Sequence, residues 1–244
     1  MIPVYVWHDT GVEKEEVKVA VDSIKRVIKE GIDISKYLPL KVIGPVDSYL
    51  EKASKRIGSY GIQYDVSHIF NLCKEDPYRE KPRIEFGILS KDLYSDDLNF
   101  VYGEAHPLAN AQDVLGGSIV STFRPKLWFG DRFLLAFRKT CIHELGHVFW
   151  VPTRRKNVEY SLGVHCIRGD CVMGQSNVER KILWEESGKI EKRFIDALEI
   201  GEKVEERIRK TGTPFCQDCL KELCETKRNF ENFLKQEFRV GKYG

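Results

Sequence analysis

The sequence lacks both a long apolar run and an excess of charge of one sign. Its 39 lysines and arginines nearly balance its 37 aspartates and glutamates, so the formal net charge is +2 at pH 7. A chain this close to neutral lacks the strong positive field that attracts nucleic acids or membrane surfaces. No stretch of about 18 apolar residues occurs, so we expect no transmembrane helix. Repeats and low-complexity tracts are also missing, and we expect one globular domain spanning residues 1–244.

Histidine is scarce, with six in the chain, yet three of the six fall between residues 143 and 165. His143 and His147 flank Glu144 in the pattern HExxH. Four residues of an α-helix turn about 400°, so both imidazoles project from one face, as two ligands of a tetrahedral zinc ion would. Glu144 lies about 100° round the helix, where it can take a proton from a water molecule in the open coordination position. The alternative is two helical histidines and a glutamate that forms a salt bridge.

The residues around this motif predict a helix, because apolar side chains recur there at helical spacing. The stripe consists of Phe133, Leu134, Phe137, Cys141, Leu145 and Val148. Pro152 closes the helix. A catalytic zinc ion needs a third protein ligand, and His165 is the candidate.

The seven cysteines are the second set of possible metal ligands. Cys166 and Cys171 are separated by four residues, and Cys216 and Cys219 by two, which is the spacing of a structural Cys₄ zinc site. Disulfides or free buried thiols are the alternatives. The odd number of cysteines and the strand-like start of the chain favour the reducing cytoplasm, where disulfides are rare. Cys224 could replace one ligand, while Cys73 and Cys141 are left over.

Strands alternate with helices along the first 150 residues, which predicts an α/β (α+β) fold with a twisted, mostly parallel sheet backed by helices. Strands are expected at residues 2–7, 40–46, 83–89, 100–102 and 119–123. Helical patches are expected after Thr10, which would cap the first helix with Glu13, and near residues 47–57 and 65–73. Beyond Met173 the chain becomes helical and highly charged.

Taken together, these residues resemble the archaemetzincins, a family of metzincin-type zinc metallopeptidases. The family pattern is HExxHxxGxxHCxxxxCxM, followed later by CxxC. The residues that fill it in order are His143, Glu144, His147, His165, Cys166, Cys171, Met173, Cys216 and Cys219. Segments 63–65, 98–105, 118–124 and 176–177 also look like family segments.

Two departures from the family pattern lie in the spacing. Seventeen residues separate His147 from His165, where the family has five, and Trp150 stands where a glycine is expected. The segment from Trp150 to Leu162 resembles an inserted loop, which we expect to bulge into solvent beside the cleft and which could act as a cover. The gap from Met173 to Cys216 is longer than in the family and is expected to hold an added helix.

The resemblance implies two zinc ions, one catalytic on the three histidines and one structural on the four cysteines. It implies a Met-turn with Met173 beneath the catalytic metal, and an antiparallel edge strand from Ser118 to Arg124 that pairs with an extended peptide. The residues expected to bind the substrate are therefore Ile119, Val120, Ser121 and Thr122. Residues 1–150 would form a subdomain with the sheet and the HExxH helix. Residues 151–244 would carry the third histidine, the Met-turn and the Cys₄ site.

We therefore predict a zinc-dependent metallopeptidase in which Glu144 is the general base toward a zinc-activated water. We expect the protein to be a cytoplasmic monomer whose partner is a peptide or protein substrate. We expect it to bind neither nucleic acid nor membranes. One alternative is a non-catalytic, zinc-stabilised module that binds a peptide or protein. A further alternative is a gluzincin-type hydrolase whose third ligand is a downstream glutamate, with Glu159, Glu185 and Glu186 as candidates.

Overall fold

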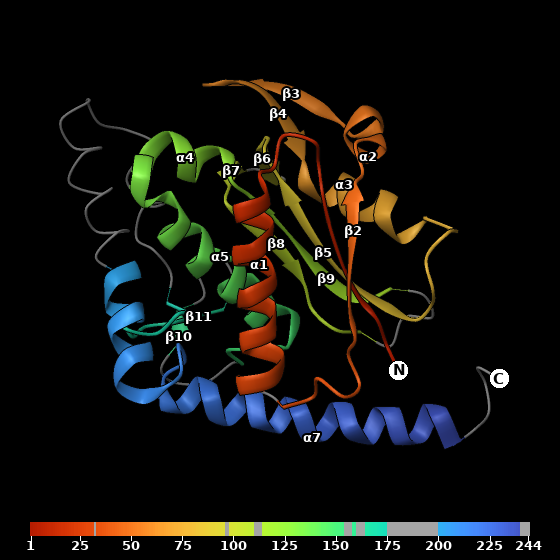
Figure 1. Cartoon of the computed structure of the whole chain (residues 1–244), viewed down its shortest axis with the longest axis vertical. Coiled ribbons are helices and arrows are strands. Elements are labelled where there is room, and N and C mark those ends of the chain that lie inside the picture. The colour runs from red at the N-terminus through yellow and green to blue at the C-terminus, as the bar shows by residue number, and fades with distance from the viewer. Residues whose placement is uncertain are drawn as a thin grey trace.

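A computed structural model of the chain describes residues 1–31, 33–95, 98–109, 114–153, 158–159, 164–174 and 200–239. The described part is a layered α/β structure, in which helices cover both faces of a twisted sheet (Figure 1). The predicted α/β fold class is confirmed. Most of the predicted inserted loop lies outside the described residues, and the helix expected between Met173 and Cys216 is described only over residues 200–211.

The central sheet has five strands in the order β2-β1-β5-β9-β8. The parallel strands are β1 (Val4–His8), β2 (Leu40–Pro45), β5 (Arg83–Leu89) and β9 (Val114–Ser121). All seven residues of β5 are buried, as expected for a parallel strand covered on both faces. The fifth strand, β8 (Gly103–His106), runs antiparallel to β9 and forms one edge of the sheet.

The edge strand is therefore not the one that the sequence predicts. Residues 118–121 belong to β9, which is paired with β5 on one side and β8 on the other. Thr122 ends this segment and precedes helix α4 (Phe123–Phe129), so Arg124 is helical. The eight residues of β9 are all buried, whereas β8 is half as long and only partly buried, which is typical of an edge. Ile119, Val120, Ser121 and Thr122 thus have no free strand edge to offer a substrate.

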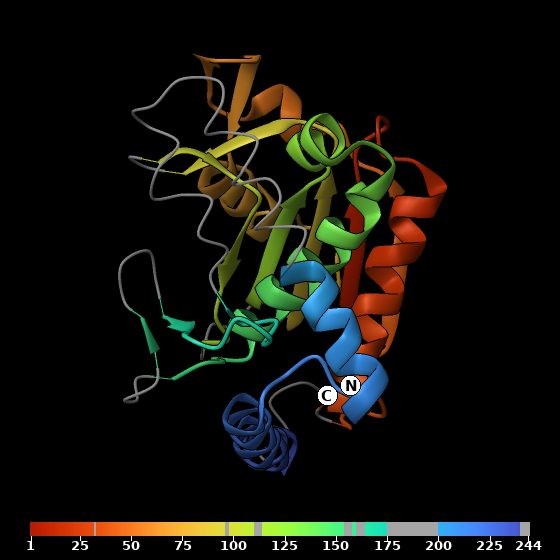
Figure 2. The same cartoon turned by 90° about the vertical axis from the view of Figure 1, so that its left-hand side faces the viewer.

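The helices divide between the two faces of the central sheet. Helices α1 (Lys14–Lys25) and α5 (Phe133–Val148) pack side by side on one face, and α3 (Val66–Lys74) lies on the other (Figure 2). Val120 belongs to the core with α1 and α5, whereas its neighbour Ile119 packs with α3. This alternation is the period of two of a β-strand buried on both faces.

Helix α1 begins at a different residue from the one predicted. Thr10 donates instead to Asp47 Oδ1, through its backbone N–H at 3.0 Å and its hydroxyl at 3.3 Å. The N-cap is Glu13, whose backbone N–H donates to Glu16 Oε2 at 2.6 Å in a reciprocal capping box. The apolar stripe of this helix survives the shift, because Ala20 and Ile24 are fully buried.

A second, smaller sheet stands at the end of β5 and β9 and has the order β3-β4-β6-β7. Its strands are β3 (Lys55–Gly58), β4 (Gly61–Asp65), β6 (Asp92–Ser95) and β7 (Leu98–Val101). The helix predicted near residues 47–57 is limited to α2 (Ser48–Lys52), since the chain then turns into the β3–β4 hairpin. Gly61 has a φ of 109°, a conformation that glycine alone adopts without strain.

The C-terminal part is helical, as predicted, over the residues that the structure describes. Residues 200–211 form a helix, and α7 (Gln217–Arg239) runs across one end of the molecule (Figure 1). Val204, Phe215 and Leu223 join the same core cluster as α1 and α5. No helix among the described residues has the length and apolar character needed to cross a membrane.

Candidate functional site

Helix α5 carries the HExxH motif on its last two turns. Phe137, Cys141 and Leu145 bury one side of the helix in the core, as the predicted stripe requires. His143 and His147 project together from the adjacent side, and their Nε2 atoms are 3.1 Å apart. The helix ends at Val148, and Trp150 then adopts a φ of 61°, in the left-handed region where the family pattern has glycine.

His165 completes the histidine cluster from a different part of the chain. It lies on β11 (His165–Cys166), which pairs with β10 (Val158–Glu159). The centroid of its ring is 5.2 Å from that of His143 and 5.1 Å from that of His147. One ring nitrogen from each of the three histidines lies within 4.8 Å of the others. The structure thus brings together the three histidines that the sequence singles out.

The imidazoles of His143 and His147 are in the form that binds a metal ion. The carbonyl oxygen of Val172 lies 2.8 Å from His143 Nδ1 and can only accept, so Nδ1 carries the proton and Nε2 keeps its lone pair for the cluster. Burial, followed by the positive charge of Lys139, lowers the pKa of His143 well below its usual value. Burial likewise lowers the pKa of His147 to about 3. Neutral imidazoles with converging nitrogens suit tetrahedral zinc, whose nitrogen ligands at 2.0–2.1 Å stand about 3.3 Å apart.

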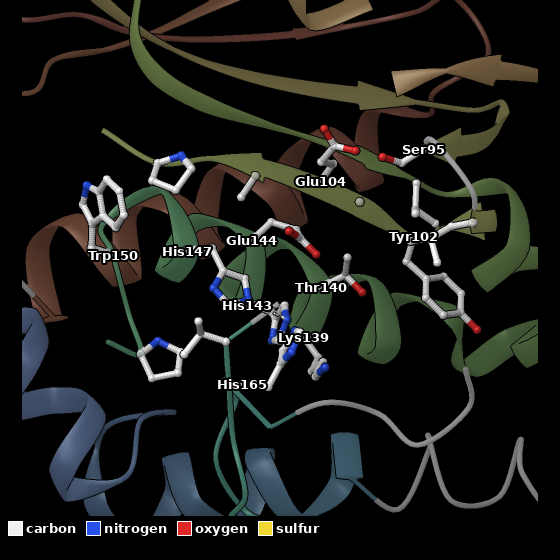
Figure 3. A pocket seen from close by; sticks show the side chains of 17 residues that line it. Ser95, Tyr102, Glu104, Lys139, Thr140, His143, Glu144, His147, Trp150 and His165 are labelled. Atoms are coloured by element: carbon white, nitrogen blue, oxygen red, sulfur yellow. Dashed lines mark hydrogen bonds between the residues drawn. The ribbon is translucent and has the colours of Figure 1, made fainter. Parts of the chain in front are cut away.

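Glu144 and the histidines line a cavity of about 420 Å³ beside the sheet edge (Figure 3). The opposite wall is the consecutive run of Tyr102, Gly103, Glu104 and Ala105 on and before β8. A Cβ atom added to Gly103 would lie 2.8 Å from Glu144 Cγ, so the backbone of β8 approaches the glutamate closely. Successive strand residues point to opposite faces, and a cavity that touches all of them must lie along the edge of the strand.

The four cysteines form a second cluster, separate from the cavity. Their Sγ atoms all lie within 4.8 Å of one another, and the Cys166–Cys216 and Cys171–Cys219 distances are each 3.7 Å. A disulfide needs about 2.05 Å. Tetrahedral zinc with Zn–S bonds of about 2.3 Å separates its sulfur ligands by about 3.8 Å, so the cluster fits a structural zinc ion. Cys224 is exposed and is not a member of this cluster.

Met173 connects the two clusters. It is fully buried against α5, where a Cβ atom on Gly146 would overlap its Sδ atom. Its carbonyl accepts a hydrogen bond of 2.9 Å from the backbone N–H of Cys166. The neighbouring Val172 carbonyl holds His143. One short segment thus supports a histidine of the first cluster and a cysteine of the second.

Two charged residues of the cavity have no place in the sequence prediction. Lys139 lies one turn before His143 on α5, and its Nζ donates to the Gly174 carbonyl at 3.2 Å. Glu104 lies on β8, where its Oε1 is 3.0 Å from His106 Nε2. The position of Lys139 four residues before His143 is visible in the sequence, whereas that of Glu104 depends on which strand forms the edge. His106, the other partner of the Glu104 contact, stacks on Phe70 with ring centroids 3.8 Å apart.

Comparison with known proteins relates the chain to archaemetzincins. No family model matches it. It is 36% identical over 99 residues to the archaemetzincin of Nanoarchaeum equitans, covering 41% of this chain and 43% of that protein. It is 31% identical over 146 residues to that of Pyrococcus furiosus, covering 57% of this chain and 65% of that protein. The matches thus span less than two thirds of these relatives' length.

Solved structures show the same fold. The crystal structure of archaemetzincin from Methanopyrus kandleri has a TM-score of 0.55 at 20% identity and covers 93% of this chain and 96% of its own. A zinc-dependent peptidase from Methanocorpusculum labreanum has a TM-score of 0.51 at 16% identity and covers 90% and 99%. At these identities the likeness concerns the fold.

Proposed function

We infer that this chain is a zinc-dependent metallopeptidase of the archaemetzincin family. The sequence similarity to archaemetzincins and the fold shared with their solved structures support this inference. The observation that carries the proposal is the meeting of three imidazoles and a glutamate in one cavity at an edge of the described sheet. The family relationship itself was predicted from the sequence and is confirmed.

The catalytic zinc ion would be held by His143, His147 and His165, and a structural zinc ion by Cys166, Cys171, Cys216 and Cys219. When bound on the histidines, zinc supplies a Lewis acid that lowers the pKa of water and polarises a carbonyl. The distances within each cluster support this assignment, since both approach the edge lengths of a zinc tetrahedron. Two zinc ions per chain is therefore the proposed content.

Glu144 is the proposed general base and acid. It follows His143 on α5, so it lies beside the histidine cluster without sharing its face of the helix. From there its carboxylate takes the proton of the attacking water and passes it to the amine that leaves when the peptide bond breaks. Gly103 lies close to the Cγ atom of Glu144 and so restricts the positions that the Glu144 carboxylate can adopt.

The substrate is proposed to add to β8 as an extended peptide. The Tyr102 carbonyl accepts from the Ser121 N–H of β9 at 2.7 Å, so the carbonyl of Tyr102 faces β9. Hydrogen-bonded and non-hydrogen-bonded pairs alternate in an antiparallel ladder. The backbone groups of Glu104 therefore also face β9, while those of Gly103 and Ala105 face the cavity. These two residues offer a substrate its backbone hydrogen bonds, and Pro107 ends the run because it has no N–H.

The alternative of a non-catalytic binding module differs from this proposal only in whether the peptide is cut. For the gluzincin-type alternative, the side chain of Glu159 and all of Glu185 and Glu186 lie outside the described residues. His165 supplies a third ligand without them. A cytoplasmic monomer that binds neither nucleic acid nor membranes stays a prediction.

The test is the Glu144→Gln variant, assayed with a library of quenched fluorescent peptides and loaded with zinc. We expect the wild type to cleave peptides and the variant to lose at least the 10²–10⁴-fold typical of general acid–base catalysis. Elemental analysis should find the same zinc content in both. The matched control is Glu15→Gln, an equal charge change at an exposed position of α1. A zinc-loaded wild type that cleaves no peptide would overturn the enzyme proposal and leave the binding module.

A further inference from the structure

Glu104 is the carboxylate of the cavity that the proposed chemistry does not use. It lies next to Gly103, the residue whose backbone approaches Glu144. Side chains alternate along a strand, so Glu104 points to the face opposite that of Gly103. Its contact with Ser67 of α3 agrees, because α3 covers the other face of the sheet from α5. Figure 3 shows Glu104 and Lys139 on opposite sides of Glu144.

The carboxylate of Glu104 is fixed in place and charged. Its Oε1 accepts from the Ser67 hydroxyl at 2.9 Å and lies 3.0 Å from His106 Nε2. Burial opposes ionisation, yet the hydrogen bonds from His106, Ser95 and Ser67 outweigh it and lower the pKa of Glu104 below its usual value. The side chain retains 21% of its exposure, so a ligand in the cavity can reach it.

The hydrogen-bond register of β8 determines what Glu104 meets. The backbone groups of Gly103 and Ala105 face the cavity, and those of Glu104 between them face β9. In an antiparallel peptide added to this edge, the residue opposite Glu104 would form a non-hydrogen-bonded pair, in which side chains approach most closely. The two Cβ atoms of such a pair are about 4.5–5.5 Å apart on the same face of the sheet, and opposite charges there attract.

We propose that Glu104 selects substrates with a lysine or arginine at the position that pairs with it, one residue from the position that lies against Glu144. The proposal rests on the proposed peptidase function and adds the class of substrate. It assigns Glu104 to specificity, with no part in the proton transfers. A cationic side chain at this position would be attracted to the fixed carboxylate of Glu104, whereas an acidic side chain would be repelled by it in a partly buried environment.

The test measures binding rather than cleavage, so that it does not depend on the proposed chemistry. The zinc-loaded Glu144→Gln protein is titrated into peptides that carry lysine, norleucine or glutamate at each position in turn, with fluorescence anisotropy as the readout. Each peptide is used in two forms, one N-acetylated and one with a free amino terminus. We expect one position at which lysine binds about fivefold or more tightly than norleucine, the strength of a partly exposed ion pair. The preference should shrink when the salt concentration rises from 50 to 500 mM, as charges become screened.

Two further substitutions in this background identify the residue responsible. Glu104→Gln should remove the preference for lysine, and Glu104→Lys should reverse it in favour of glutamate, with thermal midpoints recorded to confirm folding. Glu15→Gln, which changes the same charge outside the cavity, should keep the parent preference. If the charge reversal prevents folding, Glu104→Gln and the salt dependence still decide.

Three outcomes would overturn the proposal: no lysine preference in the parent, a preference that survives Glu104→Gln, or an effect of Glu104→Gln limited to peptides with a free amino terminus. The last would assign the carboxylate to the terminal ammonium group. Failure of the peptidase function is distinguishable, because it would appear as uncut peptides in the wild type with the binding preference intact.

Discussion

Gly146 offers the sharpest test of how the active-site helix is supported. It lies in α5 between Leu145 and His147, and its Cα faces Met173. In the Gly146→Ala variant the new Cβ would overlap Met173 Sδ and lie 3.0 Å from its Cε and 3.5 Å from Phe215 Cε1. Met173 and Phe215 are both buried, with exposures of 0% and 1%, so neither has solvent to move into.

Two opposing effects set the magnitude for Gly146→Ala. Alanine favours a helix interior over glycine by about 1 kcal/mol. An extra methyl group in a packed core costs about 1–3 kcal/mol, and the flexibility of methionine moderates this cost. Because the overlap involves the inner Sδ atom and the Met173 carbonyl is held by Cys166, we expect the cost to win, with a net loss of about 1–2 kcal/mol. For a chain of this size that lowers the thermal midpoint by roughly 2–8 °C.

The assay is urea denaturation of the zinc-loaded protein, with zinc affinity measured alongside by competition with a chelator. The control is Gly201→Ala in the helix of residues 200–211, where the new Cβ would lie 3.3 Å from the nearest atom, Leu135 Cγ. Because the overlap is relieved, Met173→Ala should cost less stability in the Gly146→Ala background than in the parent, and a double-mutant cycle gives this coupling. A Gly146→Ala protein more stable than its parent would refute the argument, since helix propensity would then outweigh packing.

Two more predictions concern the cysteine cluster and acid stability. Cys216→Ser should lower the zinc content from two ions per chain to one and reduce the free energy of unfolding by several kcal/mol, whereas the control Cys224→Ser should keep both ions. Elemental analysis measures the zinc content, and denaturation measures the stability. An unchanged zinc content in Cys216→Ser would contradict the Cys₄ assignment. Asp76→Asn should destabilise the protein at pH 7 and flatten the acid side of its stability curve. Burial opposes ionisation of Asp76, but hydrogen bonds from the Tyr49 hydroxyl at 2.6 Å and the Tyr78 N–H at 2.9 Å, with the charge of Arg79, lower its pKa below the usual value. The stability it contributes is therefore present above the unfolded pKa of about 3.9 and is lost as the pH falls through the folded pKa. Denaturation between pH 7 and pH 3 checks this, and parallel curves for the two proteins would contradict it.

The parts of the site that the sequence predicts correctly are those set by local periodicity. The helix that carries His143 and His147 follows from the spacing of its buried side chains, and its turn geometry places both imidazoles on one face. The meeting of His165 with this pair could not come from spacing, because seventeen residues intervene. It was predicted from the need of a catalytic zinc ion for a third protein ligand and from the resemblance to a family.

The edge strand shows where sequence reasoning fails. Residues 118–121 read as a strand and form one, but whether a strand lies at an edge depends on the order of strands in the sheet. That order is set by contacts between distant segments, and an apolar, fully buried strand favours the interior. The significance of Glu104 was missed for the same reason, because it depends on β8 being the edge.

The segment from Val172 to Met173 has a consequence for how the protein would respond to metal supply. Since it holds His143 through one carbonyl and Cys166 through the next, ordering either cluster also orders part of the other. Equilibrium coupling of this kind is reciprocal, so each zinc ion would raise the affinity for its companion by the same factor. Loading would then be positively cooperative, and half-filled molecules would be rarer than two independent sites allow. The chain would change from the zinc-free form to the form with both sites occupied over a narrow range of free zinc concentration.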